Sequence, residues 1–229
     1  MKNLLVLHGA LSTQNQFDDF ALYLSQTNKV ESFTFRGHGN NLKPLSGHFF
    51  DDYNEDILSY MLQNQLSKIN IFGYSMGGYA ALYFAYKYPN MVESIATLNT
   101  KFDWNIAQVS KETALLNADK IVEKVPAYAQ HLMQIHGEQN WKTMLANTKT
   151  MMEQLAQQPV LTDAILNNIN CPVLIGVGDR DNTATVAENT LVYKQLPNAQ
   201  LMVLPNTGHP FDKVNYELLY LLCNNFFNK

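Results

Sequence analysis

The chain has 229 residues, of which 46% are hydrophobic and 16% are charged, and its formal net charge is −4. This composition is typical of a globular protein with a sizeable core, and it excludes an intrinsically disordered chain. No long run of one charge sign occurs, so we expect binding neither to nucleic acid nor to an anionic membrane.

The chain opens with an apolar stretch, Met1 to Leu7, that is too short for a signal peptide. No apolar run reaches the length of about 18 residues that indicates a membrane-spanning helix. We therefore expect no membrane association and a cytoplasmic location.

Apolar runs of strand length then alternate with amphipathic stretches of helix length along most of the chain. This alternation is typical of a parallel sheet covered by helices. Strands are predicted at 4–7, 30–35, 69–72, 92–98, 172–177 and 201–204, and helices at 14–25, 50–66, 76–88, 183–196 and 210–227. The prediction is an α/β fold with a mostly parallel sheet of about six strands flanked by helices.

The stretch 103–159 departs from the alternation because its pattern is helical and contains no convincing strand. We interpret it as a helical lid inserted between two parts of the α/β core, residues 1–102 and 160–229. The alternative is a set of ordinary, longer crossover helices.

The segment Gly73-Tyr74-Ser75-Met76-Gly77-Gly78 lies between a predicted strand and a predicted helix. It fits G-x-S-x-G, in which a sharp strand-to-helix turn exposes a serine hydroxyl and the glycines relieve close contacts. The N-terminus of the following helix can supply free N–H groups to a developing oxyanion. We predict that Ser75 is a nucleophile; the alternative is a glycine-rich turn without chemistry.

A serine nucleophile needs a base and an orienting carboxylate. His209 follows the last predicted strand, and Asp179 and Asp181 follow the strand before it. Because the carboxyl ends of parallel strands share one rim, these residues are expected beside Ser75. We favour Asp181 over Asp179, since Asp179 can pair with Arg180. The turn after the first strand, His8-Gly9-Ala10-Leu11, is expected to complete an oxyanion hole with the N–H of Ala10 (or Leu11) and that of Met76; His8 itself is expected to be structural.

Together these motifs resemble the α/β-hydrolase superfamily, in its single-domain, lid-bearing serine esterase branch. His8-Gly9-Ala10 resembles the H-G-x of the oxyanion hole, Arg36-Gly37-His38-Gly39 the R-G-H-G loop, Gly73 to Gly78 the nucleophile elbow, and Gly178 to Asp181 with Gly208-His209 the acid and base motifs. The resemblance runs over nearly the whole chain and implies the α/β-hydrolase fold, with Asp181 as the acid. The chain departs from the family at Phe35 and Asn182, where Asp and Pro are frequent, and it begins at the oxyanion strand without the usual preceding hairpin.

The apolar residues expected to line the pocket indicate a small to medium carboxylic ester as substrate. We expect it to be cleaved through an acyl-enzyme intermediate without metal or cofactor. Serine at position 75 disfavours dehalogenases and epoxide hydrolases of this fold, and Tyr79 stands where a related lyase carries Arg. Expected substrate-binding residues are Leu11, Arg36, Tyr74, Trp104 and Trp141, with Tyr128, Met133, Met144 and Met151 as further candidates for the pocket lining. Arg36 can equally brace its own loop. A C–C bond hydrolase or lyase with the same triad, a non-catalytic ligand-binding module and a homodimer stay open.

Overall fold

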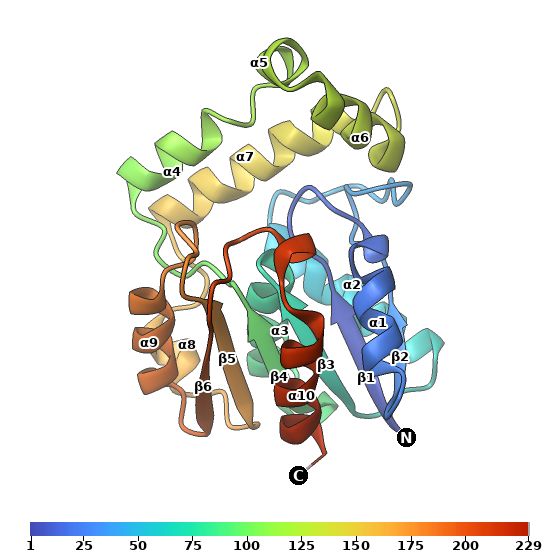
Figure 1. Ribbon diagram of the computed structural model, residues 1–229, viewed down its shortest axis with the longest axis vertical. Coiled ribbons are helices and arrows are strands. Elements are labelled where there is room, and N and C mark those ends of the chain that lie inside the picture. The colour runs from blue at the N-terminus through green and yellow to red at the C-terminus, as the bar shows by residue number, and fades with distance from the viewer. Residues whose placement is uncertain (229) are drawn as a thin grey trace.

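A single sheet of six strands runs through the computed structural model, which describes residues 1–228 (Figure 1). The strands are β1 (Lys2–Leu7), β2 (Asn28–Ser32), β3 (Ile69–Tyr74), β4 (Val92–Leu98), β5 (Val173–Gly178) and β6 (Ala199–Leu204). Their order in the sheet is β2-β1-β3-β4-β5-β6, and every neighbouring pair is parallel. The predicted α/β fold with six strands is therefore confirmed.

The central strands are buried on both faces, which explains why they are continuous apolar runs in the sequence. Because successive side chains of a strand point to opposite faces, each strand supplies both cores. Leu5, Leu7, Ile71, Ile95 and Ile175 belong to one core, and Leu4, Val6, Phe72, Ala96 and Leu174 to the other.

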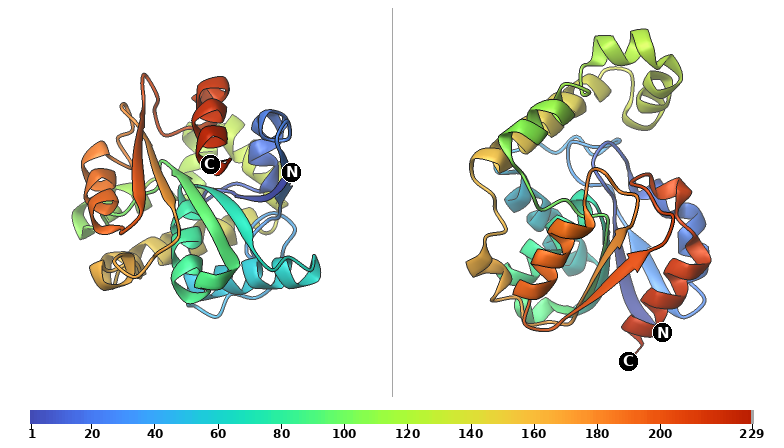
Figure 2. Two further views of the ribbon diagram at one scale, coloured as in Figure 1. Left: turned by 90° about the horizontal axis from the view of Figure 1, so that it is seen from below. Right: turned by 60° about the vertical axis from the view of Figure 1, so that its left-hand side comes forward.

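Helices cover both faces of this sheet (Figure 2). On the first face lie α2 (Phe49–Gln63), α3 (Met76–Lys87), the short α8 (Asp163–Leu166) and α9 (Val186–Gln195). On the second face lie α1 (Asp18–Leu24) and α10 (Tyr216–Phe227), which contact each other. Within the described residues, no helix has both the length and the apolar character needed to cross a bilayer.

Four further helices lie beyond the carboxyl ends of the strands (Figures 1 and 2). They are α4 (Ile106–Thr113), α5 (Ala118–Lys124), α6 (Pro126–His136) and α7 (Trp141–Gln157), together the α4–α7 segment. The segment has a small core of its own, formed by Ile121, Ala129, Leu132, Trp141, Met144 and Leu145. The helical character expected for 103–159 is present, whereas its division from the core as a lid stays a prediction.

Several predicted elements differ at their ends, and in two of them a side chain bonds the backbone where the element was expected to continue. The second strand ends at Ser32 instead of Phe35, because the N–H of Phe35 bonds to the His8 ring. The helix predicted from Thr183 begins at Val186, after a capping box in which Thr185 and Glu188 bond each other's backbone N–H groups. The helix predicted from Pro210 is a 3-10 turn, Phe211–Lys213, followed by α10.

Candidate active site

Ser75 lies on a strained turn between β3 and α3. Its backbone angles are φ 51° and ψ −119°, a region that residues other than glycine rarely occupy. A Cβ on Gly77 would lie 2.1 Å from the carbonyl oxygen of Leu7, and one on Gly73 would lie 2.5 Å from the Cα of Gly78. The two glycines are therefore required by close backbone packing, as the G-x-S-x-G pattern predicted.

The imidazole of His209 lies between Ser75 and Asp181. Its Nε2 is 3.4 Å from the Ser75 Oγ, and its Nδ1 is 2.7 Å from the Asp181 Oδ2. The Asp181 side chain is fully buried, and its Oδ1 accepts hydrogen bonds from the N–H groups of Thr183 (2.7 Å) and Ala184 (2.9 Å). A carboxylate fixed in this way orients the ring, with Nδ1 as donor and Nε2 free to accept a proton from the serine.

Asp179, the alternative acid, contacts residues other than His209. Its Oδ1 accepts the N–H of Thr207 at 3.1 Å, and its Oδ2 lies 3.8 Å from the Nε of Arg180. The structure thus brings Ser75, His209 and Asp181 together and leaves Asp179 outside the cluster.

Asn99, which the sequence analysis did not single out, holds the loops that carry the base and the acid. It follows β4 directly, has a φ of 52° and is fully buried. Its Nδ2 donates to the carbonyls of Gly208 (2.9 Å) and His209 (3.3 Å), and its Oδ1 accepts the N–H of Gly178 (2.8 Å). The hydroxyl of Tyr74 also donates to the His209 carbonyl. A polar residue at a strand end on this rim was the signal that could have identified Asn99.

The turn of residues 8–11 brings backbone donors to the same rim. Among the described residues, no acceptor bonds the N–H of Ala10, Leu11 or Met76, and all three residues line the cavity above Ser75. His8 is buried beneath this turn: its Nε2 accepts the Phe35 N–H (3.1 Å) and its Nδ1 lies 2.8 Å from the Gly9 carbonyl. Burial lowers the pKa of His8 to about 4, so the ring is neutral and serves the scaffold.

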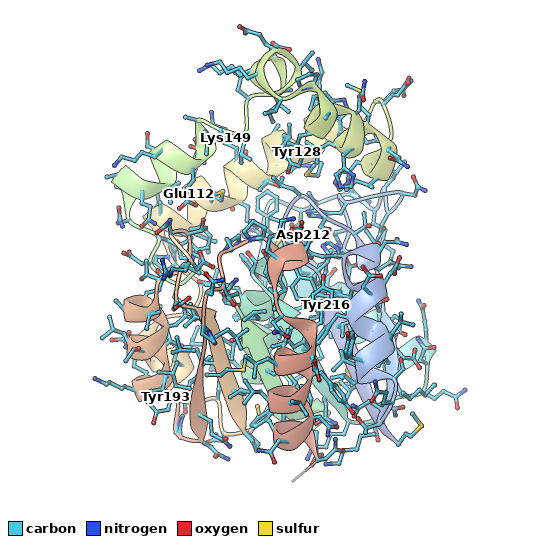
Figure 3. The ribbon with its side chains drawn as sticks, viewed as in Figure 1. Glu112, Tyr128, Lys149, Tyr193, Asp212 and Tyr216 are labelled. Atoms are coloured by element: carbon cyan, nitrogen blue, oxygen red, sulfur yellow. The ribbon has the colours of Figure 1, made fainter. Side chains whose placement is uncertain are left out.

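A cavity of about 890 Å³ extends from Ser75 toward the α4–α7 segment. The segment contributes Glu112 and Tyr128 from above, and Asp212 approaches from the rim over α10 (Figure 3). Of the residues expected to line it, Leu11, Tyr74, Trp104, Tyr128 and Met151 do so. Lining residues that the sequence analysis missed include Phe50, Tyr79, Lys101, Leu115 and Leu116.

Trp141, Met133 and Met144, by contrast, do not line the cavity. Trp141 is only 1% exposed and packs with Met144 in the internal core of the α4–α7 segment. The first turns of α7 face α5 and α6, whereas Met151, two turns later, reaches the cavity. The expected substrate-binding role of Trp141 is therefore not supported by its position.

Arg36 also lies away from the cavity, which corrects its assignment to the substrate. Its side chain is 11% exposed, and its guanidinium donates to the carboxylates of Asp56 (2.8 and 3.0 Å), Asp52 (3.2 Å) and Glu55 (3.2 Å) on α2. These carboxylates offset the cost of removing the charged guanidinium from water. Arg36 therefore ties the 36–39 loop to α2.

Comparison with known proteins shows which family and which individual proteins the chain resembles. A family model described as the alpha/beta hydrolase fold matches residues 2–154. The chain is 24% identical to Lipase 3 of Moraxella sp., over 90% of this chain and 71% of the lipase. It is also 24% identical to a pimeloyl-[acyl-carrier protein] methyl ester esterase of Neisseria meningitidis, over 92% and 88% of the two chains. A 2-hydroxy-6-oxo-6-phenylhexa-2,4-dienoate hydrolase from Rhodococcus sp. superimposes with a TM-score of 0.86 at 17% identity, covering 100% of this chain and 91% of that one.

Proposed function

The chain belongs to the alpha/beta hydrolase fold family, and from that premise we propose that it is a serine hydrolase that cleaves small to medium carboxylic esters. The observation that carries the proposal is the Ser75–His209–Asp181 cluster at the floor of a largely apolar cavity. The similarity to a lipase and to a methyl ester esterase supports ester chemistry for this site.

The proposed reaction is a two-step acyl transfer. The Ser75 Oγ attacks the ester carbonyl while its proton passes to the Nε2 of His209. The Asp181 carboxylate, 2.7 Å from Nδ1, stabilises the imidazolium that forms. His209 then protonates the leaving alcohol and activates the water that releases the acid from Ser75.

The negative charge of the tetrahedral intermediate needs donors that are already in place. The free N–H of Met76 lies at the N-terminus of α3, where the helix dipole favours negative charge. The free N–H of Ala10 or Leu11 supplies the second donor from the 8–11 turn. Loss of one such donor typically costs about 3 kcal/mol of transition-state stabilisation.

The cavity walls suggest the class of acyl or alcohol group. Trp104, Leu115, Tyr128 and Met151 present apolar surface, and a cavity of about 890 Å³ is within the usual range for small-molecule sites. We therefore expect short to medium acyl chains or aromatic alcohols to bind better than strongly charged groups.

The decisive test compares hydrolysis of p-nitrophenyl acetate and butyrate by wild type, Ser75→Ala and Ser110→Ala. Ser110 is exposed on α4 and outside the cavity, so its substitution is the matched control. Ser75→Ala should reduce kcat by roughly 10⁶-fold, as in other triads, and Ser110→Ala should leave it unchanged.

Covalent labelling by a fluorophosphonate separates the remaining alternatives. Labelling of Ser75 without turnover of any ester would favour C–C bond cleavage, which a β-diketone substrate then tests. Absence of both turnover and labelling would overturn the proposed function and favour a ligand-binding role.

A further inference from the structure

His136, the last residue of α6, lies buried between two loops of the α/β core. Its side chain is fully buried although it belongs to the α4–α7 segment. The Nδ1 accepts the N–H of Gly39 at 2.8 Å, and the Nε2 lies 3.2 Å from the carbonyl oxygen of Leu11. Because a backbone N–H can only donate, Nδ1 carries the lone pair, and Nε2 therefore carries the proton that it donates to Leu11.

Leu11 is a residue whose backbone direction matters for the proposed reaction. Its φ of 62° is the left-handed conformation, which is unfavourable for a leucine and persists only where neighbours enforce it. Its side chain packs against the internal core of the α4–α7 segment. The segment thus holds Leu11 twice, by its side chain and by its carbonyl. Ala10 and Leu11 line the cavity, and their N–H groups have no acceptor among the described residues.

We propose that His136 is a positioning residue that aims the backbone donors of the 8–11 turn at the oxyanion. The Leu11 N–H and the Leu11 carbonyl lie in consecutive rigid peptide planes that meet at the Leu11 Cα, so a hydrogen bond to the Leu11 oxygen restricts rotation of the turn that carries the donors. The inference rests on the proposed function and deepens it: the oxyanion hole is complete only while α6 is seated on the core. Packing of the α4–α7 segment on the core and correct placement of the oxyanion donors therefore depend on the same contact.

Two conservative substitutions separate the two hydrogen bonds of the ring. The amide of His136→Gln can place its NH₂ near the position of Nε2 and so retain the bond to Leu11. The amide of His136→Asn can place its oxygen near the position of Nδ1 and so retain only the bond from Gly39. Gln130→Ala, exposed on the same helix, is the control.

With p-nitrophenyl butyrate, we expect His136→Asn to lower kcat by roughly 10- to 100-fold, because the donors are misdirected but not removed. KM should change by less than about threefold, and His136→Gln should restore kcat to within a few-fold of wild type. A merely structural histidine would instead give losses that follow the thermal unfolding midpoint and are alike for both variants.

The outcomes distinguish this inference from the proposed function. An active wild type with equal kcat for His136→Asn and His136→Gln would overturn the role of His136 and leave the esterase intact. A wild type without ester turnover and without labelling of Ser75 would overturn both. Should neither variant fold, nitrogen-15 shifts of the wild-type ring decide: a proton on Nε2 is required, and a proton on Nδ1 contradicts the inference.

Discussion

Acidification is expected to destabilise this fold through a row of three buried histidines. The rings of His8 and His38 are 5.1 Å apart and those of His38 and His136 are 6.0 Å apart, each pair edge to face. All three residues are at most 4% exposed. Burial lowers the pKa of His8 to about 4, that of His38 well below its usual value, and that of His136 as well. The neighbouring His131 also disfavours a charge on His136.

The unfolded chain takes up protons on these rings near pH 6.5, whereas the folded chain resists them. Stability conferred by the neutral rings is therefore complete above about pH 6.5 and is lost as the pH falls from there toward the folded pKa. Between about pH 7.5 and pH 5, His8 alone should lower the free energy of unfolding by about 2 kcal/mol. His38 and His136 act in the same direction, and Glu188, whose pKa is raised by burial, opposes them.

Urea unfolding followed by tryptophan fluorescence at the two pH values measures the effect. His38→Gln should reduce the difference in the free energy of unfolding between the two pH values, because it removes one titrating ring. That ring makes one hydrogen bond, to the Arg36 carbonyl. Substitution of the exposed His48 by Gln should leave the difference as in wild type. The reasoning would be refuted if the free energy of unfolding of wild type were the same at the two pH values. It would also be refuted if His38→Gln and His48→Gln showed the same difference between the two pH values.

Two further predictions concern the rim and the elbow. Asn99→Ala should lower the free energy of unfolding by about 2–4 kcal/mol, since its buried hydrogen-bond partners are left unpaired. It should also reduce kcat, with a smaller effect on KM, because the main chain of His209 loses its anchor. Urea titration and kinetics with p-nitrophenyl butyrate check both effects, and an unchanged kcat would contradict the second. Gly77→Ala should prevent folding or destabilise by several kcal/mol, because its Cβ meets the Leu7 carbonyl at 2.1 Å. In the control Gly47→Ala, no atom lies within 4 Å of the added Cβ, so only the φ of +94° should matter, at a cost of about 1 kcal/mol in the free energy of unfolding. Similar losses of stability in the two variants would show that the close contact at Gly77 does not matter.

The positions of Ser75, Asp181 and His209 could be predicted because each follows an apolar run of strand length. Such runs indicate parallel strands, and all parallel strands end on one rim, so sequence order alone brings the three side chains to the same edge. The choice between Asp179 and Asp181 depended on a local pair, Asp179 with Arg180, that the structure also contains.

The direction in which a side chain points was harder to predict. Arg36 and Trp141 have the chemistry of substrate-binding residues, but one is neutralised by carboxylates of α2 and the other is enclosed within the α4–α7 segment. Asn99 and His136 were missed for a related reason. Their hydrogen-bond partners lie 79 to 125 positions away in the chain. The position of Asn99 after a predicted strand indicates the rim but not these partners, and no local pattern indicates those of His136.

Backbone strain supplies evidence for the location of the site that is independent of the serine motif. Of the five non-glycine residues with positive φ among those described, Gln65 lies at a helix end, and the other four, Leu11, Ser75, Asn99 and Asn206, follow β1, β3, β4 and β6 on one rim. Each such residue costs on the order of 1–3 kcal/mol, and the surrounding contacts must enforce it. Because four of the five residues lie at the carboxyl ends of strands, contacts such as those of Asn99, Tyr74 and His136 must hold the backbone there in conformations that are locally unfavourable. This is the expectation for a rim whose donors and base must be aimed before a substrate arrives.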